Sequence, residues 1–175
     1  MSKALFIDPT ETRRGGQIKL TNIPVNKYQK TLKEAEGDFP QGDLVRIYRD
    51  MVIIRKFEEM LFTIKTTGEY QGIRYNYPGP AHLSTGQEAS AVGQAYLLDK
   101  DDLIFGSHRS HGEVLAKGLS AIEKMDSQEL EKIMEGFDGA VLKVVQDKKG
   151  SSSHNPKELA IKFLLYGVLA EIFAR

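Results

Sequence analysis

The sequence predicts a largely helical fold with one or two short strands. Three observations support this. Apolar residues recur at helical spacing through one long segment, residues 43–67. Several Ser/Thr/Asp-x-x-Glu patterns, typical of helix starts, follow farther along the chain. Apolar runs short enough to be strands are few, and residues 103–105 (Leu-Ile-Phe) form the clearest one, which we expect to be buried.

Composition and charge exclude several classes of protein. The chain has 175 residues, of which 41% are hydrophobic, so one domain with a core is expected. Lys+Arg and Asp+Glu are equal at 24 each, which argues against a nucleic-acid or membrane partner. No cysteine is present, so disulfides and thiolate metal sites are excluded. Without a signal-peptide core or a membrane-length apolar run, we expect a cytoplasmic location.

Residues 1–42 are expected to be an extended N-terminal arm. Residues 4–7 could form a short strand, and residues 8–16 have the composition of a polar turn. Such an arm more often wraps over a partner subunit or over its own domain than carries chemistry. We place no site in it.

Residues 43–67 form the clearest predicted helix, which Asp43 can cap and Gly68 can end. Its apolar residues recur at helical spacing: Leu44, Ile47, Met51, Ile54, Phe57, Leu61 and Ile64. We expect its charged residues to form a solvated or salt-bridged face: Arg46, Arg49, Arg55, Lys56, Glu58 and Glu59.

The next segment is predicted to alternate between loops and helices. Residues 69–80 form a Gly/Tyr/Pro loop, and a capping box at Thr85 precedes a helix over residues 89–98. After the predicted strand, a second capping box at Ser110 starts a helix that Gly118 is placed to end.

Past Gly118, capping patterns at Ser120 and Asp126 predict a short helix ending near Glu135. Residues 140–145 are a brief apolar run, and residues 147–155 are a polar loop. Asn155 and Pro156 then start a last, apolar helix that runs to the end of the sequence. Its exposed face and an unpaired strand would favour a homo-oligomer.

His108 and Arg109 are the first candidates for chemistry, because they precede the start of a helix. Free backbone N–H groups and the helix dipole favour an anion there, and an arginine can clamp a phosphate. The alternative is that Arg109 pairs with a carboxylate and the histidines are solvated loop residues. The spacing alone leaves both interpretations open.

Two ordered motifs resemble the α part of thiamine-diphosphate-dependent 2-oxo acid dehydrogenases, the E1 components of the pyruvate and branched-chain types. The matching residues are His82, Leu83, Gly86, Gln87, Glu88 and Ala89, then Arg109, His111 and Gly112. The similarity spans roughly residues 44–175, as an N-terminal fragment of that part. His108 stands where the family usually has tyrosine, and residues 120–156 are longer than the usual connection.

This resemblance implies the N-terminal part of an α/β thiamine-diphosphate-binding fold, incomplete over residues 43–175. Arg109 and His108 would hold the diphosphate, and His82 and His111 would be catalytic. The Mg²⁺ ligands are expected outside this chain, because residues 136–139 lack the family's Gly-Asp-Gly triplet. The implied partners are an E1 β subunit or fused β portion, an E2 lipoyl acyltransferase and a 2-oxo acid substrate.

The implied reaction is oxidative decarboxylation of the 2-oxo acid with transfer of the acyl group to a lipoyl group of E2. The fragment should be inactive alone. Two alternatives remain at this stage: another thiamine-diphosphate enzyme of transketolase type, and a non-catalytic helical module that serves assembly.

Overall fold

The computed structural model describes residues 8–13, 15–16, 27, 29–76, 79–137, 139–147 and 155–173. The predicted strand at residues 4–7 and most of the predicted loop at residues 147–155 lie outside these ranges. The chain divides into two units, Met1–Asp38 and Phe39–Arg175.

The first unit contains two single-turn helices, α1 (Pro9–Thr12) and α2 (Leu32–Ala35). Helix α1 occupies part of the segment that was predicted as a polar turn, where Asp8 accepts the backbone N–H of Thr10 at 2.8 Å. Helix α2 begins with a complete capping box. The Glu34 carboxylate accepts the Thr31 N–H at 2.7 Å, and the Thr31 hydroxyl accepts the Glu34 N–H at 3.4 Å.

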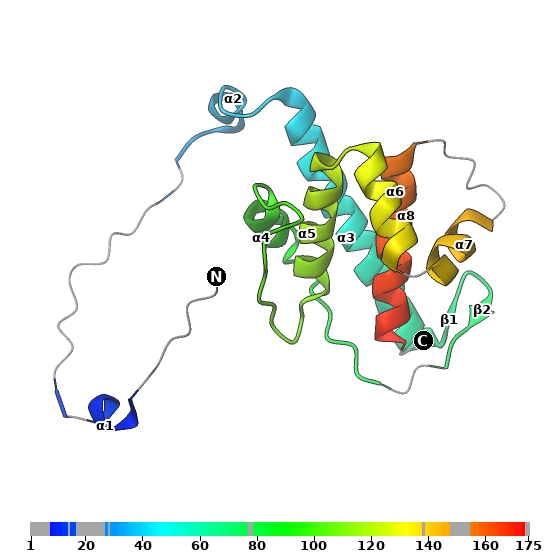
Figure 1. Cartoon of the computed structure of the whole chain (residues 1–175), viewed down its shortest axis with the longest axis horizontal. Coiled ribbons are helices and arrows are strands. Elements are labelled where there is room, and N and C mark those ends of the chain that lie inside the picture. Colours follow the sequence, from blue (N-terminus) through cyan, green and yellow to red (C-terminus); the bar gives the residue numbers. More distant parts are fainter. Residues whose placement is uncertain are drawn as a thin grey trace. The chain divides into compact units, whose positions relative to one another are not determined.

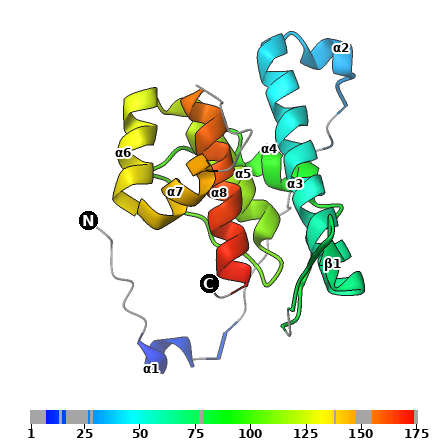
Figure 2. The ribbon, with the colours of Figure 1, turned by 90° about the vertical axis from the view of Figure 1, so that its right-hand side faces the viewer.

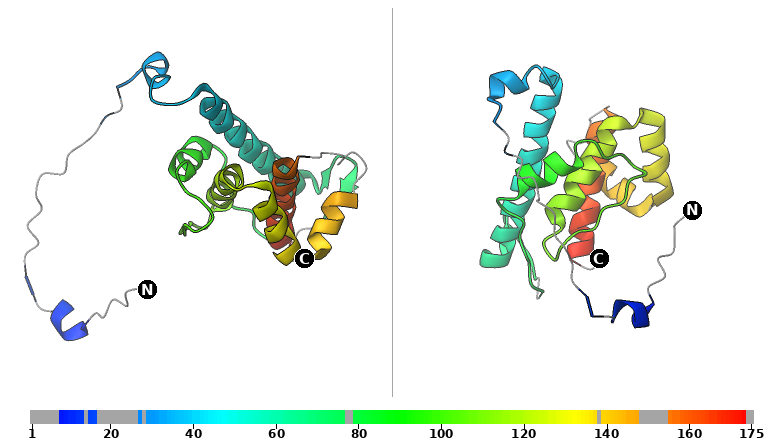
Figure 3. Two further views of the ribbon diagram at one scale, coloured as in Figure 1. Left: turned by 45° about the horizontal axis from the view of Figure 1, so that its top comes forward. Right: turned by 90° about the vertical axis from the view of Figure 1, so that its left-hand side faces the viewer.

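The second unit is a helical assembly with one small hairpin, which confirms the predicted fold class. Its elements are α3 (Gln41–Thr67), β1 (Glu69–Tyr70), β2 (Ile73–Arg74), α4 (Glu88–Ala95), α5 (His111–Lys124), α6 (Ser127–Phe137), α7 (Gly139–Asp147) and α8 (Pro156–Ile172). Helices α5 and α8 lie side by side, with α3 and α4 on one side of the pair and α6 and α7 on the other (Figures 1 and 2). Figure 3 shows this order from two further sides.

Helix α3 ends as the sequence predicts but begins two residues earlier. Gly68 closes it in the left-handed conformation, with φ 69° and its N–H donating to Ile64. Asp43 is not the cap, since its carboxylate instead accepts the Tyr96 hydroxyl at 2.5 Å. The prediction of a continuous loop after Gly68 was wrong. Strands β1 and β2 form an antiparallel hairpin whose two turn residues, Gln71 and Gly72, both have positive φ.

The prediction of a buried strand at residues 103–105 was also wrong. The segment has no regular structure, and the side chains of Leu103 and Phe105 are 88% and 99% exposed. A strand needs a neighbour to pair its backbone groups, and the described residues offer none beside it. These residues are apolar as predicted, but the described part of the chain does not cover Leu103 and Phe105.

Helix α5 passes through Gly118, which was predicted to be its end, and continues to Lys124. A Cβ atom at Gly118 would lie 2.6 Å from Leu164 Cδ2 on α8, so the glycine permits the two helices to approach closely. Ser120 is likewise not a new cap. It is buried inside α5, and its hydroxyl hydrogen-bonds with the carbonyl of Leu98 at 2.8 Å.

The predicted starts of α6 and α8 are confirmed by their caps. The Asp126 carboxylate accepts the N–H of Glu129 at 2.9 Å, and the Asn155 side chain accepts the N–H of Lys157 at 3.0 Å. The apolar run at residues 140–145 lies within α7. The last helix, expected to present an exposed apolar face, packs against α5, α6 and α7, but Ala160 is its one buried residue among those described, and its other apolar residues keep part of their surface exposed.

Two apolar clusters share the α5–α8 layer. The larger is built from α3, α4 and α5, with fully buried Ile54 and Leu115 near its centre. The smaller joins the end of α5 to α6 and α8 through Ile122, Leu130, Met134 and Ala160. Partly buried Leu164 packs against both clusters. The two sides of the unit therefore meet at α5 and α8.

A polar network also joins three helices. Arg49 on α3 contacts Asp50 at 2.8 Å and Glu123 on α5 at 3.2 Å, and Lys157 on α8 contacts Glu123 at 3.0 Å. Asp50 is buried, and this burial raises its pKa. Within the residues that the structure describes, no helix is long and apolar enough to cross a membrane.

The close approach at Gly118 can be tested by adding a methyl group. Gly118→Ala is expected to lower the free energy of unfolding by about 1–3 kcal/mol, because Leu164 is held between two clusters and has little room to move. The control is Gly93→Ala on the exposed side of α4, where nothing lies within 4 Å of the added Cβ. That variant should gain about 0.5–1 kcal/mol in urea unfolding. Equal stabilisation of both variants would contradict the proposed packing.

Candidate functional site

The candidate site forms where residues 82–84 run beside the start of α5. The rings of His82 and His108 meet edge to face, with centroids 5.1 Å apart. The guanidinium of Arg109 donates to the carbonyl of Leu83 at 3.0 Å. One step further along, the N–H of Gly112 donates to the hydroxyl of Ser84 at 3.1 Å. Three successive residues of one segment, 82–84, thus each contact a residue of the segment 108–112.

Gly112 is the point of closest approach between these segments. A Cβ atom there would lie 2.9 Å from Ser84 Oγ and 3.4 Å from Ser84 Cβ. Both residues are buried, and Ser84 is only 1% exposed. The glycine of the second motif is therefore required for packing, because it lets the start of α5 reach the first motif.

The first predicted capping box does not form. Helix α4 begins at Glu88, and its cap position is Gln87, which makes no side-chain capping bond. The Glu88 carboxylate instead accepts the N–H of Gly86, at 3.0 and 3.1 Å, and a two-pronged clamp from Arg55 on α3, at 2.6 and 2.9 Å. The hydrogen bonds from Arg55 lower the pKa of Glu88 to about 2.

The second predicted capping box does not form either, because neither of its two hydrogen bonds is present. Ser110 is the cap position of α5, as predicted, but its side chain makes no capping bond. The Glu113 carboxylate reaches back to the N–H of Ser107 at 3.3 Å, three residues before the cap. This contact holds the loop that carries His108 and Arg109 against the first turn of α5.

The position of Glu58 differs from the prediction, and this difference affects the site more than any other. Glu58 was predicted on a solvated or salt-bridged face of α3, but its side chain is fully buried. One carboxylate oxygen accepts the N–H of Ser84 at 3.0 Å, and the other lies 3.2 Å from Nδ1 of His111. A buried carboxylate is tolerated when its oxygens are hydrogen-bonded in this way.

The structure brings all four predicted site residues to this junction. His82 and His108 touch, Arg109 holds the neighbour of His82, and His111 reaches the same loop through Glu58. His82, His108 and Arg109 are exposed, whereas the side chain of His111 is 20% exposed. In the described part of the chain, the partner found for the Arg109 guanidinium is a carbonyl group and not a carboxylate, so N–H groups are left for an anion.

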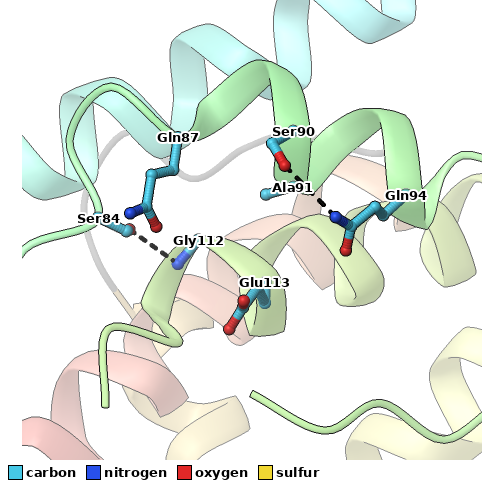
Figure 4. Close-up of a pocket in the computed structure, with 7 residues that line it drawn as sticks. All are labelled: Ser84, Gln87, Ser90, Ala91, Gln94, Gly112 and Glu113. Atoms are coloured by element: carbon cyan, nitrogen blue, oxygen red, sulfur yellow. Dashed lines mark hydrogen bonds between the residues drawn. The ribbon is translucent and has the colours of Figure 1, made fainter. Parts of the chain in front are cut away.

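A small polar pocket of about 220 Å³ adjoins the junction, between α4 and the first turn of α5 (Figure 4). It is lined by Ser84, Gln87, Ser90, Ala91, Gln94, Gly112 and Glu113. Two of its lining residues, Ser84 and Gly112, make the bond that joins the two motifs. Among the described residues, no group of three or more His, Asp or Glu side chains is arranged to hold a metal ion.

A larger cavity of about 750 Å³ lies along α5 and α8 and is mainly apolar. Ser110 and His111 line it, together with apolar residues of α6 and α8 such as Met134, Phe163 and Val168. His111 therefore belongs to two environments. Its Nδ1 side meets Glu58, and the residue also borders a space that could take an apolar group.

The residues that the sequence analysis missed are Glu58 and Ser84. Glu58 is one residue after Phe57, four after Ile54 and three before Leu61, so helical spacing alone places it on the core face of α3. This spacing is the signal in the sequence that indicates burial of Glu58, in spite of its charge. Nothing in the sequence singled out Ser84, whose role depends on a long-range contact.

Comparison with known families gives an independent indication. The sequence profile of the family described as "Dehydrogenase E1 component" matches residues 49–164. This range contains most of α3, both motifs of the junction, and most of the helices that support them.

Individual proteins match shorter stretches. The chain is 37% identical over 85 residues to a pyruvate dehydrogenase E1 component subunit alpha of Rhizobium meliloti, covering 49% of this chain and 22% of that protein. It is 38% identical over 82 residues to the alpha subunit of an acetoin:2,6-dichlorophenolindophenol oxidoreductase of Cupriavidus necator, covering 47% and 22%. A mitochondrial pyruvate dehydrogenase E1 alpha subunit of Schizosaccharomyces pombe is 30% identical over 112 residues, covering 64% and 26%. The chain thus spans about a quarter or less of the length of these relatives, and no solved structure matches it.

The clamp between Arg55 and Glu88 can be tested by its pH dependence. The pKa of Glu88 lies near 2 in the folded protein and near 4.5 ordinarily, so the clamp contributes stability above about pH 4.5 and loses it as the pH falls toward 2. Glu88→Gln is expected to lower the free energy of unfolding by about 2 kcal/mol at pH 7, a figure reduced for the partly exposed Arg55. More than half of this difference should be gone by about pH 3.

The control for this test is Glu59→Gln, which removes the ion pair between Glu59 and Lys56 on α3. Both side chains of that ion pair are exposed, so its loss should change stability very little at either pH. Urea unfolding followed by circular dichroism measures both variants. A Glu88→Gln effect no larger than that of the control would show that the clamp does not stabilise the start of α4.

Proposed function

The chain belongs to the dehydrogenase E1 component family, and we propose that it is the N-terminal part of the α portion of a thiamine-diphosphate-dependent 2-oxo acid dehydrogenase E1. The observation that carries this proposal is the junction itself. Both family motifs, separate in the sequence, meet there through Arg109, Ser84 and Gly112, within the matched range. The domain assignment of residues 43–175 as an incomplete cofactor-binding domain is part of the same proposal.

Arg109 and His108 are proposed to hold the diphosphate. The guanidinium is exposed and already oriented by its bond to Leu83, and its remaining N–H groups suit phosphate oxygens. His108, packed against His82, can donate an imidazole N–H in place of the phenol that the family usually has there. The donor set at the junction therefore fits an anionic group.

His82 and His111 are proposed to act on protons near the reacting centre. Imidazole exchanges protons near neutral pH, which suits it to acid–base catalysis. When bound, thiamine diphosphate would supply the nucleophilic carbon and accept the electrons released on decarboxylation. This chain would contribute the orientation of the cofactor and two proton-handling groups, with Mg²⁺ ligands supplied from outside it.

The partners follow from the same proposal. An E1 β subunit or fused β portion would complete the site, and an E2 lipoyl group would accept the acyl product. The substrate would be a 2-oxo acid of the pyruvate or branched-chain type, and the complete enzyme would be a homo-oligomer of such units. A cytoplasmic location stays a prediction; several relatives are named as mitochondrial or chloroplastic proteins.

Acetoin oxidation is a second candidate function. Alpha subunits of acetoin oxidoreductases from Cupriavidus necator and Bacillus subtilis match this chain about as closely as the pyruvate enzymes do. The two activities can be separated by assaying the complete enzyme with pyruvate, with branched 2-oxo acids and with acetoin, using 2,6-dichlorophenolindophenol as electron acceptor. Turnover of acetoin alone would favour the second candidate.

Arg109→Ala tests the diphosphate clamp. Loss of a charge-assisted two-pronged contact should weaken the binding of thiamine diphosphate and Mg²⁺ to the complete E1 by about 10- to 100-fold, measured by calorimetry. Arg109→Lys, which keeps the charge but not the fork, should fall between. Arg74→Ala on exposed strand β2 is the control and should leave affinity unchanged. Unchanged affinity in Arg109→Ala would contradict the clamp and favour a non-catalytic assembly role.

His82→Ala tests the catalytic role of the exposed histidine. We expect kcat of the complete enzyme to fall by about 10²- to 10⁴-fold while cofactor affinity changes little, because proton transfer and not binding is removed. The steady-state assay and the calorimetric titration together separate these two effects. A protein that loses its fold, or one that keeps full turnover, would contradict the role.

A further inference from the structure

The buried carboxylate of Glu58 has a distinctive set of partners. Its side chain is 0% exposed, and it projects from the core face of α3, beside Ile54 and Leu61 in the helical spacing. Its two oxygens take two different partners: the backbone N–H of Ser84 at 3.0 Å and His111 Nδ1 at 3.2 Å. Removing a carboxylate from water is costly, and an apolar residue would fill this core position at lower cost. A carboxyl group at this core position, in contact with two other segments of the chain, indicates a purpose beyond packing.

The geometry limits the form that His111 can take. An ionised carboxylate only accepts hydrogen bonds, so the neutral imidazole must carry its proton on Nδ1 to keep this contact. The second nitrogen, Nε2, is then left without a proton and can accept one. In metal sites and in hydrolytic triads, a carboxylate that accepts a hydrogen bond from one ring nitrogen of a histidine likewise fixes the orientation and the tautomer of the ring.

We propose that Glu58 is a positioning residue with two effects. It keeps the proton of His111 on Nδ1, so that Nε2 is the nitrogen that accepts a proton, and it fixes the position of the loop that carries His82 relative to His111. The proposal rests on the proposed function, in which both histidines handle protons. Glu58 touches neither substrate nor cofactor. It acts through His111 on one side and through the backbone of Ser84, two residues after His82, on the other.

The tautomer of His111 tests the first half of this proposal without any activity assay. In the full chain labelled with nitrogen-15 histidine, long-range proton–nitrogen correlation spectra at mildly alkaline pH report which ring nitrogen carries the proton. His111→Gln identifies the signal. The wild-type protein should show the Nδ1-protonated form. In Glu58→Gln, one of the two acceptor oxygens becomes an NH2 group that donates. With the amide oxygen held by the Ser84 N–H, this NH2 group faces Nδ1, so most of the His111 population should shift its proton to Nε2.

Two further variants keep the result interpretable. Glu58→Asp retains both acceptor oxygens and should retain the Nδ1 proton, so it decides the matter if Glu58→Gln does not fold by circular dichroism. Glu88→Gln removes the charge of another buried carboxylate near the same loop and should leave the His111 tautomer unchanged. An Nε2-protonated wild-type His111, or an Nδ1 proton that persists in Glu58→Gln, would overturn the proposal.

Turnover of the complete E1 tests the second half. Glu58→Gln should lower kcat by about 10- to 100-fold with KM within about twofold of wild type, and Glu58→Asp should recover part of the loss. A merely structural role would lower stability without this split or this recovery. If the wild-type enzyme neither binds thiamine diphosphate nor turns over a 2-oxo acid or acetoin, the proposed function fails, and the tautomer measurement still decides the role of Glu58.

Discussion

The bridge from Glu58 to Ser84 and His111 is the constraint on which the rest of the site depends. It joins the middle of the longest helix to a loop and to the first residue of α5, which are 26 and 53 residues away in the sequence. Because the carboxylate is fully buried, its geometry is protected from solvent and from competing water. The surrounding core of α3, α4 and α5 supplies that protection, so packing and site geometry are not separable here.

Around this bridge the fold uses small residues where backbones must approach. Gly112 lets α5 reach the Ser84 loop, and Gly118, six residues later, lets α8 lie against α5. Ion pairs also connect the helices. Arg55 and Glu88 connect α3 to α4, and Arg49, Glu123 and Lys157 connect α3, α5 and α8. The result is a frame of helices that presents exposed His82, His108 and Arg109 at one junction.

Helices α6 and α7 stand apart from this site frame. They pack on the side of α5 and α8 away from α3. Together with α5 and α8 they line the open apolar cavity that His111 borders. Exposed Leu103 and Phe105, near the site loop, are apolar surface that the described part of the chain does not cover.

Most of the helices and the family could be predicted from the sequence, because periodicity, helix caps such as Asn155 and Asp126, and short motifs are local properties. The four candidate residues of the site also follow from the sequence, and their roles stay a prediction. Only the tertiary structure decided what each carboxylate does. Glu88 was expected to cap a helix but binds Arg55. Glu58 was expected on a solvated or salt-bridged face but contacts Ser84 and His111 in the core. Residues 103–105 were expected to form a strand but have no regular structure. The reason is physical: a cap needs neighbours within one turn, whereas a buried charge or a strand needs partners that only the folded chain brings together.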